Sequence, residues 1–114
     1  MRLIGKSKLL KHKRKNRGNT RLSNALDKLI EDLENNNPQN DIELRQLRSG
    51  IDKVHNDGFY FIDISVHRSL VLLEFDEVGE ATIIWVGSHE EYETTFKNNK
   101  STIKKWLRAN DYIK

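Results

Sequence analysis

Residues 59–86 read FYFIDISVHRSLVLLEFDEVGEATIIWV, a segment dominated by aromatic, β-branched and leucine side chains. Such residues favour strands, and the segment contains three apolar runs at 59–64, 70–75 and 81–86. Short connections separate the runs, so the sequence predicts an antiparallel meander of three strands. Because the two later runs are apolar at nearly every position, parts of both faces of the sheet should be covered.

Two helices are predicted in the N-terminal half of the chain. Residues 6–16 contain good helix formers but only two residues to bury, Leu9 and Leu10, so this helix should be mostly exposed to solvent. Asn19 or Thr20 can cap the helix that follows. Its apolar residues recur with helical spacing and form one continuous stripe: Leu22, Leu26, Leu29, Ile30 and Leu33. The helix should end in the asparagine-rich run that precedes the only proline.

Three further segments complete the expected organisation. Residues 2–5 can form a short strand, whereas residues 41–50 are ambiguous between a helical turn and a strand and are expected to be irregular. A last amphipathic helix is predicted over residues 101–110, with Ile103, Trp106 and Leu107 on one face. The order βααβββα predicts an α+β fold in which two N-terminal helices pack on a small antiparallel sheet and a C-terminal helix is added.

The length and composition restrict the classes of protein to be considered. A chain of 114 residues with 36% hydrophobic residues can build one modest core, and we expect a single domain over residues 1–114. No apolar run reaches the ~18 residues that a membrane-spanning helix needs, and no signal peptide is recognised. The chain has no cysteine, which excludes disulfides, thiolate metal sites and cysteine nucleophiles. A cytoplasmic protein is the simplest interpretation.

The net charge of +3 conceals a strongly uneven distribution of charge. Residues 1–21 contain nine basic residues and no acidic one, and residues 94–114 contain six basic residues and one acidic one. Between them, residues 22–93 contain five basic residues and sixteen acidic ones. Two basic ends around an acidic middle indicate a polyanionic partner.

Two groups of basic residues are candidates for RNA binding. The first lies on the N-terminal helix and just after it, and consists of Lys11, Lys13, Arg14, Lys15 and Arg17. No aromatic residue is interleaved with it, which favours contact with the phosphate backbone over stacking on bases. The second group precedes the meander and consists of Arg45, Arg48 and Lys53. The alternatives are a solubilising helix or a docking face for an acidic protein for the first group, and solvated loop side chains for the second.

The candidate catalytic residues lie at the end of the last predicted strand and at the start of the second predicted strand. Residues 88–93, SHEEYE, place His89, Tyr92 and three carboxylates within a short segment. Arg68 precedes the second strand run and can bind phosphate with its planar guanidinium. The alternatives are an ordinary charged helix start, in which Tyr92 packs with Phe96, and a surface arginine paired with an acid.

Metal-dependent and nucleophilic hydrolysis find little support in the sequence. The run from His89 to Glu93 has the form H-E-x-x-E, whereas a zinc protease places a second histidine at the last position. The sequence also has no nucleophile elbow and no glycine-rich phosphate loop. We expect no metal and no cofactor.

Several segments together resemble a known family. They are DIELRQL at 41–47, DKV at 52–54, FIDI at 61–64 followed by HRSLV at 67–71, and SHEEYE at 88–93. These segments resemble the HigB toxins of bacterial type II toxin–antitoxin systems, within the wider RelE-like superfamily. The resemblance covers roughly residues 20–96.

The resemblance implies a RelE-like fold and an mRNA endoribonuclease that works at the ribosome and is silenced by a cognate antitoxin, expected to be a helix-turn-helix protein. It implies metal-independent cleavage, in which the 2′-hydroxyl of the RNA attacks the neighbouring phosphate. By this resemblance His89 is a general base or acid, Tyr92 a proton donor or stacking group, Arg68 the phosphate stabiliser and Glu91 an orienting residue.

Two features depart from the family pattern. Glu93 stands where an aspartate is usual and is not counted as catalytic, and the lysine-rich residues 97–114 extend beyond short family members. That extension can either bind ribosomal RNA or complete the core through Trp106. Two rival interpretations remain: a non-catalytic nucleic-acid-binding module that uses the N-terminal helix, and a protein-interaction domain with an acidic partner.

Overall fold

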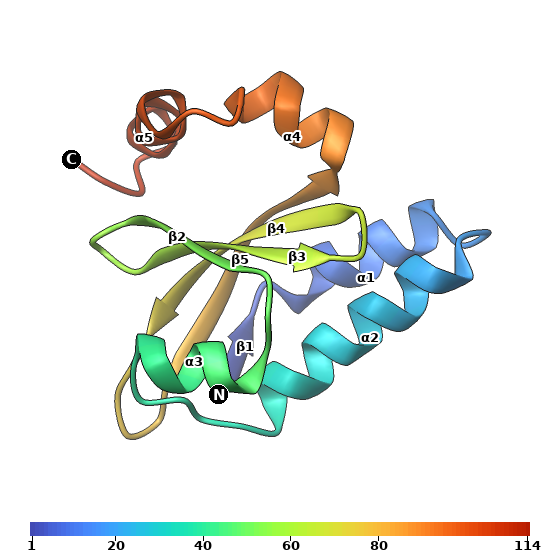
Figure 1. Cartoon of the computed structure of the whole chain (residues 1–114), viewed down its shortest axis with the longest axis horizontal. Helices are drawn as coiled ribbons and strands as arrows, with labels where there is room; N and C mark the ends of the chain where they lie inside the picture. The colour runs from blue at the N-terminus through green and yellow to red at the C-terminus, as the bar shows by residue number, and fades with distance from the viewer.

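A mixed five-stranded sheet forms the centre of the computed structural model, which describes residues 1–114 (Figure 1). The strand order is β1-β5-β4-β3-β2. In chain order the elements are β1 (Arg2–Ile4), α1 (Lys6–Lys15), α2 (Thr20–Glu34), α3 (Asp41–Leu47), β2 (Ile51–His55), β3 (Phe59–Ile64), β4 (His67–Glu74), β5 (Glu80–Ser88), α4 (His89–Phe96) and α5 (Lys100–Ala109). None of these helices combines the length and apolar character needed to span a bilayer.

The predicted meander is confirmed as β3, β4 and β5, which pair antiparallel in that order. The prediction of a purely antiparallel sheet is wrong, because β1 pairs parallel with β5 and Arg2 lies opposite Glu80. Local sequence cannot show this pairing, since the two strands are separated by most of the chain. The α+β class is confirmed.

The predicted helices α1 and α2 contribute to a core on one face of the sheet. Asn19 caps α2 by accepting a hydrogen bond from the backbone N–H of Leu22 at 3.1 Å, as the sequence suggested. The apolar stripe of α2 and Leu9 of α1 are buried against strand residues of the same face, which include Ile62, Ile64, Val71 and Ile83.

The opposite face of the sheet carries α4 and α5. Phe61 and Leu70 of the sheet form a second core there with Tyr92, Phe96, Ile103 and Leu107. Because alternate strand residues face the two cores, the strands are apolar at nearly every position. Trp106 of α5 packs against Phe96 with ring centroids 5.2 Å apart, so the C-terminal extension does complete the core.

The prediction that residues 41–50 are irregular is wrong for residues 41–47, and the count of three helices is also wrong. Residues 41–47 form α3, whose start is capped by Asn40, which accepts a hydrogen bond from the backbone N–H of Glu43 at 2.9 Å. The next segment, Ile51–His55, is an edge strand paired with β3. Both elements are short and bury one residue each, so neither produces a clear apolar period. With α4, the helices number five.

Candidate active site

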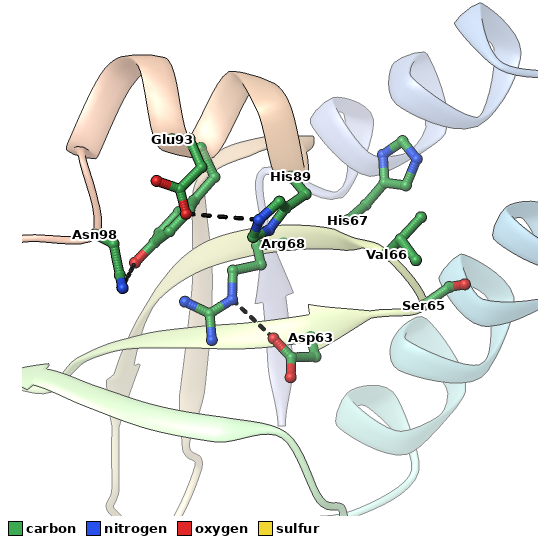
Figure 2. Close-up of a pocket in the computed structure, with 9 residues that line it drawn as sticks. Asp63, Ser65, Val66, His67, Arg68, His89, Glu93 and Asn98 are labelled. Atoms are coloured by element: carbon green, nitrogen blue, oxygen red, sulfur yellow. Dashed lines mark hydrogen bonds and ion pairs between the residues drawn. The ribbon is translucent and has the colours of Figure 1, made fainter.

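A cavity of about 480 Å³ opens at the end of the sheet where β3, β4 and α4 meet (Figure 2). Three of the four predicted catalytic residues line it, namely Arg68, His89 and Tyr92. The other lining residues are Asp63, Ser65, Val66, His67, Glu93 and Asn98. The antiparallel register explains the assembly: Arg68 of β4 lies opposite Asp63 of β3 and opposite Gly87 of β5, and β5 leads directly into α4.

Arg68 is the cation of the cavity. Its Nε donates a hydrogen bond to Asp63 Oδ1 at 2.8 Å, and its guanidinium carbon lies 4.8 Å from the centre of the Tyr92 ring. Burial of the guanidinium acts to lower its pKa, but the hydrogen bond and the charge of Asp63 outweigh burial, and the pKa of Arg68 is raised. The side chain is therefore a permanent cation, and its Nε is the atom that is paired with Asp63, which leaves Nη1 and Nη2 on the side away from that carboxylate.

Tyr92 belongs both to the core and to the cavity. Its side chain is only 2% exposed and packs edge-on against Phe61, with ring centroids 4.9 Å apart. The hydroxyl donates a hydrogen bond to Asn98 Oδ1 at 2.9 Å. Burial raises the pKa of Tyr92, while the charge of Arg68 opposes the shift. The Tyr92 ring is thus packed within the protein, and the residue also forms part of the cavity lining.

His89 is the exposed proton-transfer candidate at the first position of α4. Its side chain is 66% exposed, and its Nε2 lies 3.5 Å from Glu93 Oε1, one helical turn later. This contact is an ion pair when His89 is protonated. Glu93, which the sequence analysis did not count as catalytic, thus lines the cavity and lies beside His89.

Glu91 lies outside the cavity and acts at the start of α4. Its carboxylate accepts a hydrogen bond from the backbone N–H of Ser88 at 2.9 Å, while Ser88 Oγ accepts one from the N–H of Glu91 at 3.1 Å. The hydrogen bond from the Ser88 backbone holds the pKa of Glu91 below its usual range. This capping box fixes the helix start that carries His89 and Tyr92, which agrees with an orienting role.

Sequence reasoning did not select three of the polar residues at the cavity. Asp63 is the one charged residue in the apolar run 59–64, and that contrast was a usable signal. His67 lies at the start of β4, and its Nδ1 is 2.9 Å from Nε2 of His12 on α1. Burial lowers the pKa of His67, and the charge of Glu91 opposes this shift. Asn98 follows α4 with a left-handed backbone, φ 46°, and nothing in its local sequence marks it.

The N-terminal basic group is mostly free. Lys11, Arg14, Lys15 and Arg17 are exposed, whereas Lys13 forms an ion pair with Asp27 at 2.8 Å. The contact between His12 and His67 joins α1 to the strand that carries Arg68. The basic helix therefore lies next to the cavity.

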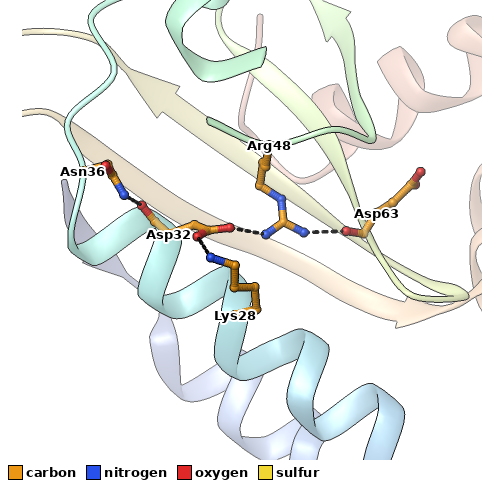
Figure 3. Close-up of polar contacts among 5 residues, drawn as sticks. All are labelled: Lys28, Asp32, Asn36, Arg48 and Asp63. Atoms are coloured by element: carbon orange, nitrogen blue, oxygen red, sulfur yellow. Dashed lines mark hydrogen bonds and ion pairs between the residues drawn. The ribbon is translucent and has the colours of Figure 1, made fainter. Parts of the chain in front are cut away.

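The second basic group is largely engaged within the chain, and Figure 3 shows the contacts of Arg48. Arg48 donates to Asp32 Oδ2 at 3.0 Å and to the Asp63 carbonyl at 2.9 Å, and its side chain is only 14% exposed. Arg48 is therefore engaged within the chain, whereas the sequence placed it among the candidates for RNA binding. Arg45 pairs with Asp41 at 3.1 Å, and the Lys53 amino group lies 5.9 Å from the centre of the Tyr60 ring.

This fold and site define a small α+β protein with a polar cavity at the end of its sheet, which contains one arginine, and a basic helix beside it. Comparison with protein families is more specific: a family model described as the HigB toxin, the RelE-like toxic component of a toxin–antitoxin system, matches residues 22–95. The chain belongs to the HigB toxin family. No curated protein matches the chain.

The matched residues include Arg68, His89, Glu91 and Tyr92. They do not include α1, which contributes His12, or Asn98 and α5. No group of three or more histidine, aspartate or glutamate side chains is arranged to hold a metal ion.

Proposed function

We propose that this toxin is an mRNA endoribonuclease that cuts translated messages at the ribosome, in the cytoplasm, without a metal ion. The observation that carries the proposal is the meeting of a permanent cation, Arg68, with His89 and the Tyr92 hydroxyl in one cavity. Membership of a RelE-like toxin family supports it, since endoribonuclease activity is general among these toxins. The basic helix α1, adjacent to the cavity, supplies a surface for the RNA backbone.

In this mechanism the substrate provides its own nucleophile. The 2′-oxygen attacks the neighbouring phosphorus, the bond from phosphorus to the 5′-oxygen breaks, and a 2′,3′-cyclic phosphate and a 5′-hydroxyl are formed. His89 accepts the proton from the 2′-hydroxyl or donates one to the leaving oxygen, a role worth about 10²–10⁴-fold in rate. Nη1 and Nη2 of Arg68 neutralise the charge that develops on the phosphate.

Tyr92 and Glu91 have supporting roles in this scheme. The Tyr92 hydroxyl is the second group in the cavity that can donate a proton, and to do so it must exchange its hydrogen bond to Asn98 for one to the substrate. Glu91 acts by holding the start of α4 in place. A cognate antitoxin, expected to carry a helix-turn-helix, is the partner that keeps the toxin inactive.

The second candidate is a non-catalytic nucleic-acid-binding module. The exposure of Lys11, Arg14, Lys15 and Arg17 favours it. Such a module would bind RNA or DNA with an affinity that falls steeply with salt, and this binding would survive His89→Ala.

The test is expression of wild type, Arg68→Ala and His89→Ala in a bacterial host, combined with mapping of RNA 5′ ends in a cell-free translation reaction. Wild type should arrest growth and cut mRNA, and both variants should lose cleavage by about 10²-fold or more. His55→Ala, which alters a histidine on the edge strand β2, is the matched control and should cut like wild type. Full toxicity of a folded Arg68→Ala/His89→Ala double variant would refute the site.

A further inference from the structure

The orientation of the Arg68 guanidinium is set by three neighbours. Its Nε is held by Asp63 Oδ1 at 2.8 Å. Its central carbon lies 4.8 Å from the centre of the Tyr92 ring and 5.5 Å from that of Phe61. The hydrogen bond fixes which edge of the guanidinium is engaged, and the rings limit its tilt. The edge formed by Nη1 and Nη2 is left for a ligand in the cavity.

The backbone of Asp63 is held by neighbouring segments, while its side chain is 47% exposed. It is the direct cross-strand partner of Arg68, and its backbone N–H donates to the Gly50 carbonyl at 2.9 Å. Gly50 packs so closely that a Cβ there would lie 2.8 Å from the Asp63 Cβ and 3.0 Å from Oδ2. The Asp63 carboxylate therefore has little freedom to move toward β2.

The backbone of Asp63 is also linked to α2 through Arg48 (Figure 3). Arg48 donates to the Asp63 carbonyl at 2.9 Å and to Asp32 Oδ2 at 3.0 Å. Asp32 is buried and binds Lys28 as well, at 2.7 Å. A continuous set of contacts thus runs from α2 through Arg48 and Asp63 to Arg68.

The charge of Asp63 makes this arrangement informative. A carboxylate beside a phosphate site repels the substrate, so Asp63 weakens binding of a polyanion while it orders the arginine. Asp63 therefore contributes to the orientation of Arg68 and not to the affinity for RNA. Such orientation matters because a misplaced charge can cost about 10²-fold in rate. The proposed mechanism requires such orientation of Arg68 toward the phosphate.

We propose that Asp63 is a positioning residue for RNA cleavage, which directs the Nη1 and Nη2 edge of Arg68 at the scissile phosphate. The proposal rests on the endoribonuclease activity proposed above. It assigns to Asp63 an effect on the maximal rate that is separate from substrate binding.

The experiment measures single-turnover cleavage of an mRNA in a reconstituted translation reaction as a function of toxin concentration. Asp63→Ala should lower the maximal rate about 10–100-fold while the half-saturating concentration stays constant or falls. Asp63→Asn, which keeps the acceptor oxygen and removes the charge, should stay within about 3-fold of the wild-type rate. Asp57→Ala, a matched change at an aspartate 64% exposed on the neighbouring hairpin, should behave like wild type.

A second comparison tests whether Asp63 acts through Arg68. In an Arg68→Lys background the Nε donor is gone, so adding Asp63→Ala should change the rate no further. Circular dichroism checks that each variant is folded. Asp63→Glu, which keeps the charge but moves the carboxylate by one methylene, replaces the alanine variant if that one does not fold, and it should lose rate in the same way.

The outcomes separate this inference from the proposed function. A wild-type maximal rate for Asp63→Ala, or an equal loss in the Arg68→Lys background, overturns the positioning role even if Arg68→Ala and His89→Ala are inactive. A loss in Asp63→Asn as large as that in Asp63→Ala also overturns it. If the wild type cuts no RNA, the proposed function fails and the positioning role fails with it.

Discussion

His12 Nε2 lies 2.9 Å from His67 Nδ1, and this hydrogen bond joins the basic helix α1 to the first residue of β4. Both histidines are 7% exposed, and burial lowers the pKa of each below the ordinary 6.5. The repulsion between them adds to the shift of His12. The charged groups nearby are Glu91, which opposes both shifts, and Lys15, which adds to that of His12.

This pair predicts a loss of stability in acid. The unfolded chain binds more protons at these two positions than the folded chain below pH 6.5, so the free energy of unfolding should fall as pH decreases from about 6.5 through the folded pKa values. Urea unfolding at several pH values measures the slope. His12→Gln should flatten it, whereas His55→Gln should not; equal slopes for all three proteins would contradict the assignment.

The Asp32–Arg48 pair predicts a large effect from a single buried charge. Asp32→Ala would leave Arg48 without its carboxylate and should lower the free energy of unfolding by about 3 kcal/mol in urea unfolding. Asp27→Ala is the matched control on the same helix, because its pair with Lys13 is exposed and should be worth less than about 1 kcal/mol. Similar losses for the two variants would show that Asp32 is no more important than a surface acid.

Substitution of Gly50 should affect both the stability of the protein and the rate of RNA cleavage. Its φ is +71°, and a Cβ there would lie 2.8 Å from the Asp63 Cβ. Gly50→Ala should therefore cost about 1–2 kcal/mol of unfolding free energy and also slow RNA cleavage, because Asp63 is displaced. Gly18→Ala, where a Cβ would meet nothing within 4 Å, should leave both quantities near their wild-type values.

Replacement of Lys97 by glycine should stabilise the protein. It ends α4 with φ 55°, a left-handed conformation that costs a lysine more than a glycine. Lys97→Gly should raise the free energy of unfolding by about 0.5–1 kcal/mol in urea titration. Lys104→Gly removes the same charge within the regular part of α5 and should lower stability by about 1 kcal/mol. Destabilisation by both changes would exclude relief of strain at Lys97.

Much of the fold could be predicted because its signals are local. The stripe of α2 follows from helical spacing of apolar residues, and its cap follows from the asparagine before it. The strands β3 to β5 follow from apolar runs within single segments. The short elements α3 and β2 bury one residue each and have no such period, and their formation depends on a cap for α3 and on pairing with β3 for β2. The candidate site was predicted only in part. The sequence selected Arg68, His89 and Tyr92, which line one cavity, but it did not select Asp63, His67 and Asn98 of the same lining.

The sequence alone determined the α+β class, the meander, the two basic ends and the resemblance to the HigB toxins, because these depend on residue types and spacings within short segments. Only the tertiary structure decided that β1 pairs parallel with β5, that Arg48 is held by Asp32, and that Arg68 is oriented by Asp63. The burial of the Tyr92 ring and the contact between His12 and His67 are also properties of the tertiary structure. These relationships link residues distant along the chain or on different elements, so they depend on strand register and on how the helices pack across the sheet.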